Sequence, residues 1–178
     1  LDYYARQIQQ IGGSRATELL PGEQNELHYE PLGVVGLIAP WNFPLAITLG
    51  MTSAALAAGN AVVLKPAEQS PAIGAELHGI LRRAGVPAGA IALVQGGGEV
   101  GAALASHDGV RGVAFTGSRA VGRELLRSAA ASPTRDGSIK RVICEMGGKN
   151  AIVVDDDADA DEAVVAILES AFGYQGQK

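Results

Sequence analysis

The fold of this chain can be inferred from one stretch, Val34-Val35-Gly36-Leu37-Ile38-Ala39-Pro40-Trp41-Asn42-Phe43-Pro44. Its first part, 34–39, is an apolar run typical of a buried strand, and the small residues of 45–58 predict a helix after it. Pro40 and Pro44 stiffen the loop between them, because proline fixes φ and has no N–H donor. Ligands of open parallel α/β sheets bind at the carboxyl ends of the strands. We therefore expect a binding site at 39–44.

Asn42 is a polar side chain of this loop and allows two interpretations. A side-chain amide held beside a strand end can donate to an oxygen that gains negative charge during a reaction. An isolated Asn before a helix is also a common turn or capping residue. The residues at the other strand ends, described below, favour the first interpretation.

Strand and helix alternate along the rest of the chain about every 25–30 residues, a spacing typical of βαβ units and a parallel sheet. Ser70-Pro71 marks one helix start, with Ser70 as the expected N-cap. The predicted fold class is therefore α/β, a doubly wound parallel sheet of the Rossmann-like type. Further strands are expected at 61–65, 91–94, 112–115, 141–144 and 151–154, and further helices at 71–84, 99–106, 119–131 and 158–172.

The first residues of the chain lack this alternation. Residues 1–11 resemble the end of a helix, and 14–31 are polar, with a turn at Pro21-Gly22 and a short strand expected at 27–29. We therefore divide the chain into 1–31, which packs outside the sheet, and 32–178, which forms the sheet domain.

Composition limits the possible functions. The chain has 178 residues, of which 47% are hydrophobic and 19% charged, so it can form a globular core. A net charge of −5 with scattered Arg and Lys argues against a nucleic-acid partner. A single cysteine excludes an internal disulfide and fits a reducing compartment, so we expect a cytoplasmic protein. No apolar run reaches about 18 residues, so we expect no membrane span.

Two strand ends carry candidate ligand-binding residues. Lys65 and Glu68 follow one strand and could hold a polyol such as a ribose, although such a pair is more often a solvated surface pair. The segment Phe115-Thr116-Gly117-Ser118 runs from a strand into a helix. Its glycine and the free N–H groups of the helix start would suit a phosphate, and the alternative is an ordinary turn.

Gly96-Gly97-Gly98-Glu99-Val100-Gly101 matches the G-x-G-x-x-G pattern of dinucleotide sites. It follows the third strand of the series rather than the first, and an acidic residue at the usual later position is not evident. We interpret it as a tight turn near a cofactor rather than as the phosphate site.

Glu145, in Glu145-Met146-Gly147-Gly148-Lys149, ends a further strand. Partial desolvation there would raise the pKa of its carboxyl toward the value that a general base needs, and the alternative is an ion pair with Lys149 or Lys140. Cys144 precedes it within an apolar strand, so we interpret Cys144 as a small buried hydrophobe rather than a nucleophile.

We expect no metal site. The acids of 155–161 resemble the start of a calcium loop, but the required glycine is Ala160 and the later bidentate acid is absent, so they predict a solvated helix start. The histidines, His28, His78 and His107, lack metal-ligand spacing.

Taken together, these motifs resemble the aldehyde dehydrogenase superfamily, over nearly the whole chain from about residue 31. The matching segments, in order, are 40–44, 59–68, 115–118 and 145–149. Met146 stands where Leu is commoner in the family. The family's nucleophilic Cys follows a segment like Gln175-Gly176-Gln177-Lys178, so we expect the chain to be a piece of a longer polypeptide, an NAD-binding domain that stops just before that Cys and before the catalytic domain.

The resemblance implies a role for each matching residue. The enzyme would oxidise a small-molecule aldehyde with NAD(P)+ through a thioester, with Asn42 holding the oxyanion and Glu145 activating water. Lys65 and Glu68 would hold the adenosine ribose and Ser118 the pyrophosphate. A carboxylate at Glu68 favours NAD over NADP, because it repels a 2′-phosphate. The remaining cofactor residues would be Ile38, Ala39, Pro40, Trp41, Gly117, Val121 and Gly147.

Within the superfamily, residues 174–178 and the loop 132–141 are similar to the 1-pyrroline-5-carboxylate dehydrogenases, which oxidise glutamate γ-semialdehyde to glutamate in proline breakdown. The resemblance also implies a homo-oligomer. Two alternatives stay open: a non-catalytic NAD-binding module, and a reductase that uses an acyl-CoA or acyl phosphate and needs no water-activating carboxylate.

Overall fold

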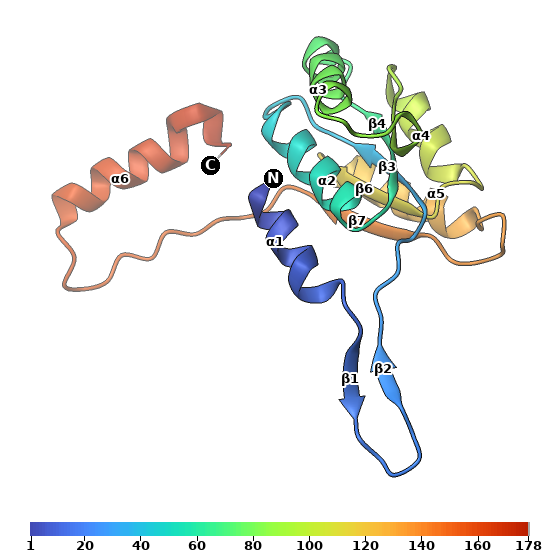
Figure 1. Cartoon of the computed structure of the whole chain (residues 1–178). Helices are drawn as coiled ribbons and strands as arrows, with labels where there is room; N and C mark the ends of the chain where they lie inside the picture. The colour runs from blue at the N-terminus through green and yellow to red at the C-terminus, as the bar shows by residue number, and fades with distance from the viewer. Residues whose placement is uncertain (178) are drawn as a thin grey trace. The chain divides into compact units, whose positions relative to one another are not determined.

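The central strand of the fold is β3 (Val34–Ile38), the apolar run at which the sequence analysis began. The structure is a computed structural model that describes residues 1–177, and the chain divides into two compact units, 1–147 and 148–178 (Figure 1). In the first unit β3 pairs in parallel with β4 (Ala61–Lys65) on one side and with β6 (Gly112–Thr116) on the other. Strands β5 (Ile91–Leu93) and β7 (Arg141–Glu145) form the two edges.

The strand order β5-β4-β3-β6-β7 confirms the doubly wound parallel sheet. The chain moves outward from β3 to β5 and then returns to place β6 on the other side of β3, so the order reverses between β3 and β6. In such sheets this reversal is the topological switch point, where the loops after the two strands diverge and leave a crevice. The register places Ile38 beside both Lys65 and Phe115, at the carboxyl ends of the three central strands.

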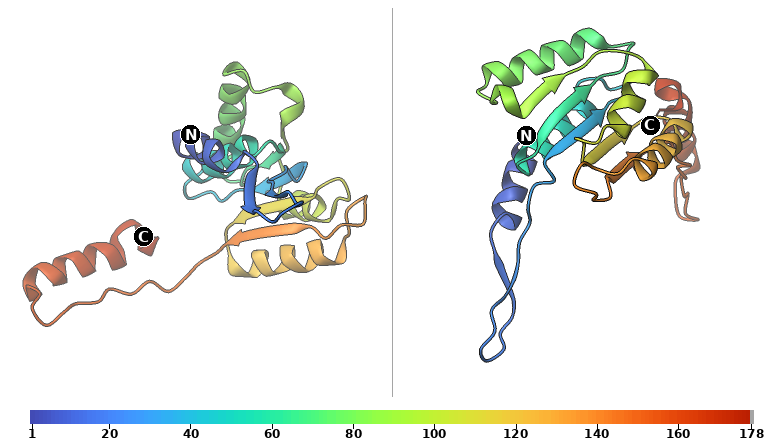
Figure 2. Two further views of the ribbon diagram at one scale, coloured as in Figure 1. Left: turned by 60° about the horizontal axis from the view of Figure 1, so that its bottom comes forward. Right: turned by 90° about the vertical axis from the view of Figure 1, so that its right-hand side faces the viewer.

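Helices cover both faces of the sheet (Figure 2). On one face, α2 (Ala46–Ala57) and α3 (Pro71–Arg83) pack against alternate residues of β3 and β4, with Leu37 and Leu64 fully buried. On the other, α4 (Gly98–Ser106) and α5 (Arg119–Ala131) pack against Ile38 and Phe115. A short 3-10 turn, η1 (Ala88–Ala90), leads into β5. These helices lie within two residues of their predicted bounds.

The junction between α2 and β4 shows how the sequence ends a helix. Gly59 has a φ of +79°, and its N–H donates to the carbonyl of Leu56 while that of Asn60 donates to Ala55. This is the Schellman arrangement, which requires the left-handed conformation that glycine adopts at low cost. The Asn60 side chain donates to the carbonyl of Ala55 and accepts from the N–H of Gly33, so it also fixes the entry to β3. The predicted cap at Gly59-Asn60 is confirmed.

Residues 1–31 form a helix and a hairpin. Helix α1 (Asp2–Ile11) lies against α2, and β1 (Arg15–Glu18) pairs antiparallel with β2 (Asn25–Leu27) in a two-stranded sheet of its own that projects from the rest of this unit (Figure 1). The short strand expected at 27–29 therefore occurs two residues earlier. Strand β1 was not predicted, because all four of its residues are exposed and it has no apolar alternation.

The second unit contains α6 (Ala160–Phe172) and η2 (Gly173–Gly176), and Lys178, the last residue of the predicted sheet domain, lies outside the described residues. Asp159 caps α6 by accepting from the N–H groups of Asp161 and Glu162, as expected of a solvated helix start. The strand predicted at 151–154 is wrong. Its apolar pattern suits a strand, but a strand needs a neighbour for its backbone hydrogen bonds, and among residues 1–177 this segment pairs with none. Among residues 1–177, no helix combines the length and the hydrophobicity that a bilayer span requires.

Candidate functional site

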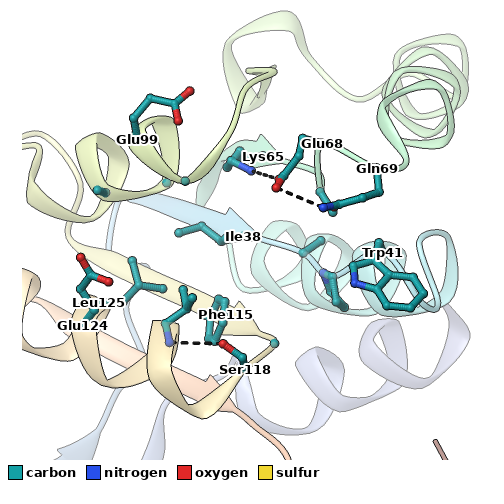
Figure 3. Close-up of a pocket in the computed structure, with 18 of the residues that line it drawn as sticks. Ile38, Trp41, Lys65, Glu68, Gln69, Glu99, Phe115, Ser118, Glu124 and Leu125 are labelled. Atoms are coloured by element: carbon teal, nitrogen blue, oxygen red, sulfur yellow. Dashed lines mark hydrogen bonds and ion pairs between the residues drawn. The ribbon is translucent and has the colours of Figure 1, made fainter.

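A pocket of about 650 Å³ lies at the switch point, bounded by the carboxyl ends of β3, β4 and β6 and by α4 and α5 (Figure 3). All of its lining belongs to the first unit. Nine of the ten residues predicted for a cofactor line it, namely Ile38, Ala39, Pro40, Trp41, Lys65, Glu68, Gly117, Ser118 and Val121. Predicted residues from three separate segments of the sequence, 38–41, 65–68 and 117–121, thus meet in one place, as the strand-end argument requires.

The pocket has an apolar interior. Ile38, Ala39, Phe115 and Leu125 are each at most 7% exposed, and Gly101 presents no side chain between them and Lys65. A Cβ at Gly101 would lie 3.7 Å from both Ile38 and the Lys65 stem, in ordinary contact. Such walls suit a flat, weakly polar group such as a nucleobase, whose burial gains hydrophobic free energy.

Lys65 and Glu68 stand at one edge of this interior. The Lys65 side chain is 4% exposed, and its Nζ donates to the carbonyl of Pro66 and lies 3.6 Å from Oε2 of Glu68, whose side chain is 53% exposed. The alternative of a solvated surface pair is therefore wrong for Lys65. A hydrogen bond from its own backbone amide lowers the pKa of Glu68. Slight burial opposes this, and the Lys65 charge and Gln69 add to it, so Glu68 is an anionic acceptor at neutral pH.

The turn after β6 forms the opposite edge. Ser118 is the N-cap of α5, and its Oγ accepts from the N–H of Val121, which leaves the hydroxyl proton free to donate into the pocket. Gly117 lies against the Phe115 ring, where a Cβ would come within 2.6 Å of Cζ. The first amides of a helix lack partners within it and carry the positive end of the helix dipole, so this edge can bind an anionic group.

Sequence reasoning missed several lining residues. Gln69, next to Glu68, had no motif to indicate it. Helix α4 contributes Gly98, Glu99, Gly101 and Ala102, which supports the interpretation of 96–101 as a tight turn beside the pocket. Helix α5 contributes Val121, Glu124, Leu125 and Ser128. Their spacing of three and four residues from Val121 is that of one helix face, a signal that could have identified them.

Asn42 is half-buried in the loop after β3 and does not line the pocket. The capping alternative is wrong, because the N-cap of α2 is Leu45, three residues later. Ser70 is a similar correction. Helix α3 begins at Pro71 as expected, but the Ser70 side chain makes no capping hydrogen bond, and its Oγ has no partner among the described residues.

Glu145 also lies outside the pocket. It is exposed, so none of residues 1–177 covers it enough to give the partial desolvation that the sequence predicted. The cause is its place on the edge strand β7. Val142 and Cys144 pack against the core on the α4–α5 face, whereas the alternate residues Ile143 and Glu145 are exposed. Gly147 is likewise exposed, and it is not among the residues that line the pocket.

One hydrogen bond connects Glu145 to the pocket. The N–H of Gly117 donates to the carbonyl of Glu145 over 3.0 Å, so the turn that lines the pocket is attached to the end of β7.

Cys144 is half-buried, and desolvation raises the pKa of its thiol, which disfavours the reactive thiolate. Its expected role as a packing residue is therefore consistent with its surroundings.

The strand order and the pocket at its switch point define a Rossmann-like α/β domain of the kind that holds a nucleotide at its strand ends. The chain belongs to the aldehyde dehydrogenase family, whose family model matches residues 1–178.

Three relatives illustrate the match. The chain is 48% identical, over its whole length, to the 1-pyrroline-5-carboxylate dehydrogenase of Bacillus mycoides (strain KBAB4), of which it covers 35%. It resembles the crystal structure of proline utilization A (PutA) from Bdellovibrio bacteriovorus with a TM-score of 0.92 and 47% identity, over 99% of this chain and 18% of that one. For a mutant of Thermus thermophilus 1-pyrroline-5-carboxylate dehydrogenase the TM-score is 0.89 at 43% identity, over 99% of this chain and 35% of that one. The chain thus spans about a third of the length of its curated relatives.

Proposed function

We propose that this chain is the NAD-binding part of an aldehyde dehydrogenase that oxidises L-glutamate γ-semialdehyde to glutamate. The observation that carries the proposal is the convergence of nine predicted cofactor residues on one pocket at the switch point of the sheet. The substrate is proposed from relatives 48% and 43% identical that are named as 1-pyrroline-5-carboxylate dehydrogenases.

Different parts of the pocket would hold different parts of a dinucleotide, which gives the bound nucleotide one orientation. Glu68 would accept hydrogen bonds from ribose hydroxyls, with the buried Lys65 ammonium beside it. The Ser118 hydroxyl and the first amides of α5 would hold the pyrophosphate, and the apolar interior would cover the adenine. When bound, NAD supplies the acceptor for the hydride that leaves the substrate carbon. We propose NAD rather than NADP, because the anionic Glu68 disfavours a 2′-phosphate.

Asn42 and Glu145 act on the substrate in this proposal. The Asn42 amide donates to the oxyanion that forms when a thiol attacks the aldehyde, and Glu145 removes a proton from the water that cleaves the thioester. The thiol is not Cys144, and we expect it directly after Lys178 in the complete reading frame. Glu145 is exposed here, so its function as a base requires further structure to cover it. We also propose that the complete enzyme is a cytoplasmic homo-oligomer.

The test of the proposal is turnover of the polypeptide encoded by the complete reading frame. We expect NADH formation with glutamate γ-semialdehyde and a higher kcat/KM for it than for an uncharged aldehyde of similar length. Binding of NAD without turnover of any aldehyde would contradict the enzymatic proposal and favour a non-catalytic module.

Glu145→Gln separates hydrolysis from acyl transfer. The amide keeps the shape of the carboxylate but cannot accept a proton from water, so only hydrolysis of the thioester should be slowed. We expect a rapid burst of one NADH per site, followed by a steady-state rate reduced by about 10²-fold or more. Glu76→Gln is the matched control and should retain the steady-state rate, because Glu76 is an exposed carboxylate of α3 that pairs with Arg83 and does not line the pocket. Unchanged turnover in Glu145→Gln would refute this role and favour a reductase that uses an acyl-CoA or acyl phosphate.

A further inference from the structure

The carboxylate of Glu68 is held from two sides. Its Oε2 lies 3.6 Å from the Nζ of Lys65, and its Oε1 accepts a hydrogen bond from the Nε2 of Gln69 over 3.2 Å. Both interactions are drawn in Figure 3, where Glu68 lies between the other two side chains. Gln69 itself lines the pocket.

The two contacts have different effects. A separation of 3.6 Å is longer than an ordinary hydrogen bond, so Lys65 supplies charge but little directional restraint. The Gln69 amide lies within hydrogen-bond distance, and such a bond depends strongly on direction. Glu68 is half-exposed and has three rotatable side-chain bonds, so without the amide its carboxylate would be free to turn toward solvent.

Glu68 is also distinct from the other carboxylates that line the pocket. Glu99 accepts from the N–H of Gly97 over 3.0 Å and is thereby engaged at the start of α4. Glu124 lies on α5, at the opposite wall from β4. Glu68 is the carboxylate of the lining that has both a cation and a side-chain amide beside it.

We propose that Gln69 is a positioning residue that sets the preference for NAD over NADP by holding the Glu68 carboxylate toward the pocket. This inference rests on the proposed function. A fixed carboxylate accepts from the 2′-hydroxyl of the ribose of NAD and repels the 2′-phosphate of NADP. A released carboxylate rotates away, and the ammonium of Lys65 is then left to attract the phosphate.

The consequence is a selective change in affinity. Loss of the Gln69 amide removes an ordering contribution from NAD binding but removes a repulsion from NADP binding. We therefore expect Gln69→Leu to bind NAD somewhat more weakly and NADP more tightly. The dissociation constant of NADP divided by that of NAD should fall by about fivefold, the size typical of the net contribution of one ordinary hydrogen bond.

The chain provides its own reporter and control. Trp41, its single tryptophan, lines the same pocket, so quenching of its fluorescence by NAD+ and NADP+ gives both dissociation constants on the 178-residue chain. Gln95→Leu is the matched control. Gln95 Nε2 donates over 3.1 Å to the carbonyl of Pro71 at the start of α3, yet Gln95 does not line the pocket. Each variant loses one glutamine hydrogen bond, so a general loss of stability should appear in both. A change in the ratio of the NADP and NAD dissociation constants should appear in Gln69→Leu alone.

The outcomes separate the two proposals. If neither nucleotide quenches Trp41 in the unsubstituted chain, the proposed function fails. If the unsubstituted chain prefers NAD and Gln69→Leu retains the same ratio, or if Gln95→Leu changes it equally, the inference about Gln69 fails while the proposed function stands. Equal affinity of the unsubstituted chain for both nucleotides would also refute the inference. Should Gln69→Leu fail to fold, Gln69→Asn, whose amide is too short to reach Glu68 in the same way, replaces it with the same expected fall.

Discussion

At the scale of single residues, two buried lysines differ in the groups that their ammonium contacts. Lys65 places its ammonium against one carbonyl, that of Pro66, and against the half-exposed Glu68 at the edge of the pocket. Lys140 donates over 2.9 Å and 2.7 Å to the carbonyls of Ala105 and His107, at the C-terminal end of α4. The first lysine lines the pocket, and the second donates to carbonyls at the end of α4.

This difference predicts opposite effects of the same substitution. Lys65→Met removes a desolvated charge without leaving a buried charge behind, so the free energy of unfolding should be unchanged or slightly raised, while NAD affinity falls about tenfold. Lys140→Met removes one donor from each of two carbonyls, although that of His107 still accepts from the N–H of Val110, and should cost about 2 kcal/mol. Urea denaturation and titration of Trp41 fluorescence measure both effects. A large loss of stability in Lys65→Met would show that this lysine is structural.

Asp136 gives a prediction of pH dependence. Hydrogen bonds from Thr134 and from the hydroxyl and amide of Ser138, followed by the charge of Arg111, hold the pKa of Asp136 well below its ordinary value of 3.8, against slight desolvation. Because its pKa is lower in the folded state, this carboxylate stabilises the fold above pH 3.8 and loses that effect as the pH falls further. Asp136→Asn should therefore lower the urea midpoint near neutral pH, with a difference from the unsubstituted chain that shrinks below pH 3.8. A constant difference across the range would contradict this assignment.

At the scale of elements, the distance between β3 and α4 depends on a glycine. A Cβ at Gly36 would lie 2.7 Å from Cγ of Leu104, a buried residue of α4. Because α4 forms one wall of the pocket, its close approach to β3 also determines the width of the site. The sequence motif 96–101 identified the start of α4, but the requirement for glycine at 36 arises from packing that only the folded chain displays.

Gly36→Ala should therefore lower stability by about 1–3 kcal/mol, the usual cost of overpacking, and should weaken NAD binding as α4 is displaced. Gly50→Ala is the control. Gly50 lies within α2 and has no atom within 4 Å of an added Cβ, so alanine there should raise stability by about 0.5–1 kcal/mol through helix propensity. Thermal unfolding of the two variants should shift in opposite directions. A stabilised Gly36→Ala would show that β3 and α4 have room to separate.

At the scale of the whole molecule, the parts that could be predicted are those whose signals are local. Apolar runs, proline and glycine stops and helix periodicity predict the alternation, and the alternation implies a parallel sheet whose strand ends meet. That reasoning brought Lys65, Glu68 and Ser118 together correctly. It failed at 151–154, where an apolar run has no neighbouring strand among the described residues, and at Glu145, where exposure follows from the edge position of β7. Gln69 could not be inferred as a pocket residue, because its hydrogen bond to Glu68 is a contact that no sequence pattern indicates.

The same distinction between local and packed structure predicts uneven stability along the chain. Helix α6 has no buried residue, and Val165 and Phe172 on it are 65% and 76% exposed, whereas Leu37 of β3 and Leu64 of β4 are 0% exposed. A helix of 13 residues has marginal stability in water without packing, because its nucleation is costly and an exposed apolar face contributes no burial free energy. We therefore expect the amides of α6 to exchange hydrogen at rates close to those of an isolated helix, while the amides of β3 and β4 exchange only through global unfolding.

Hydrogen exchange resolved by peptide on the 178-residue chain measures this contrast between α6 and the central strands. Protection of α6 equal to that of β3 would show that α6 is covered in solution, and in that case the exposed apolar side chains of α6 would be the surface to examine for a contact.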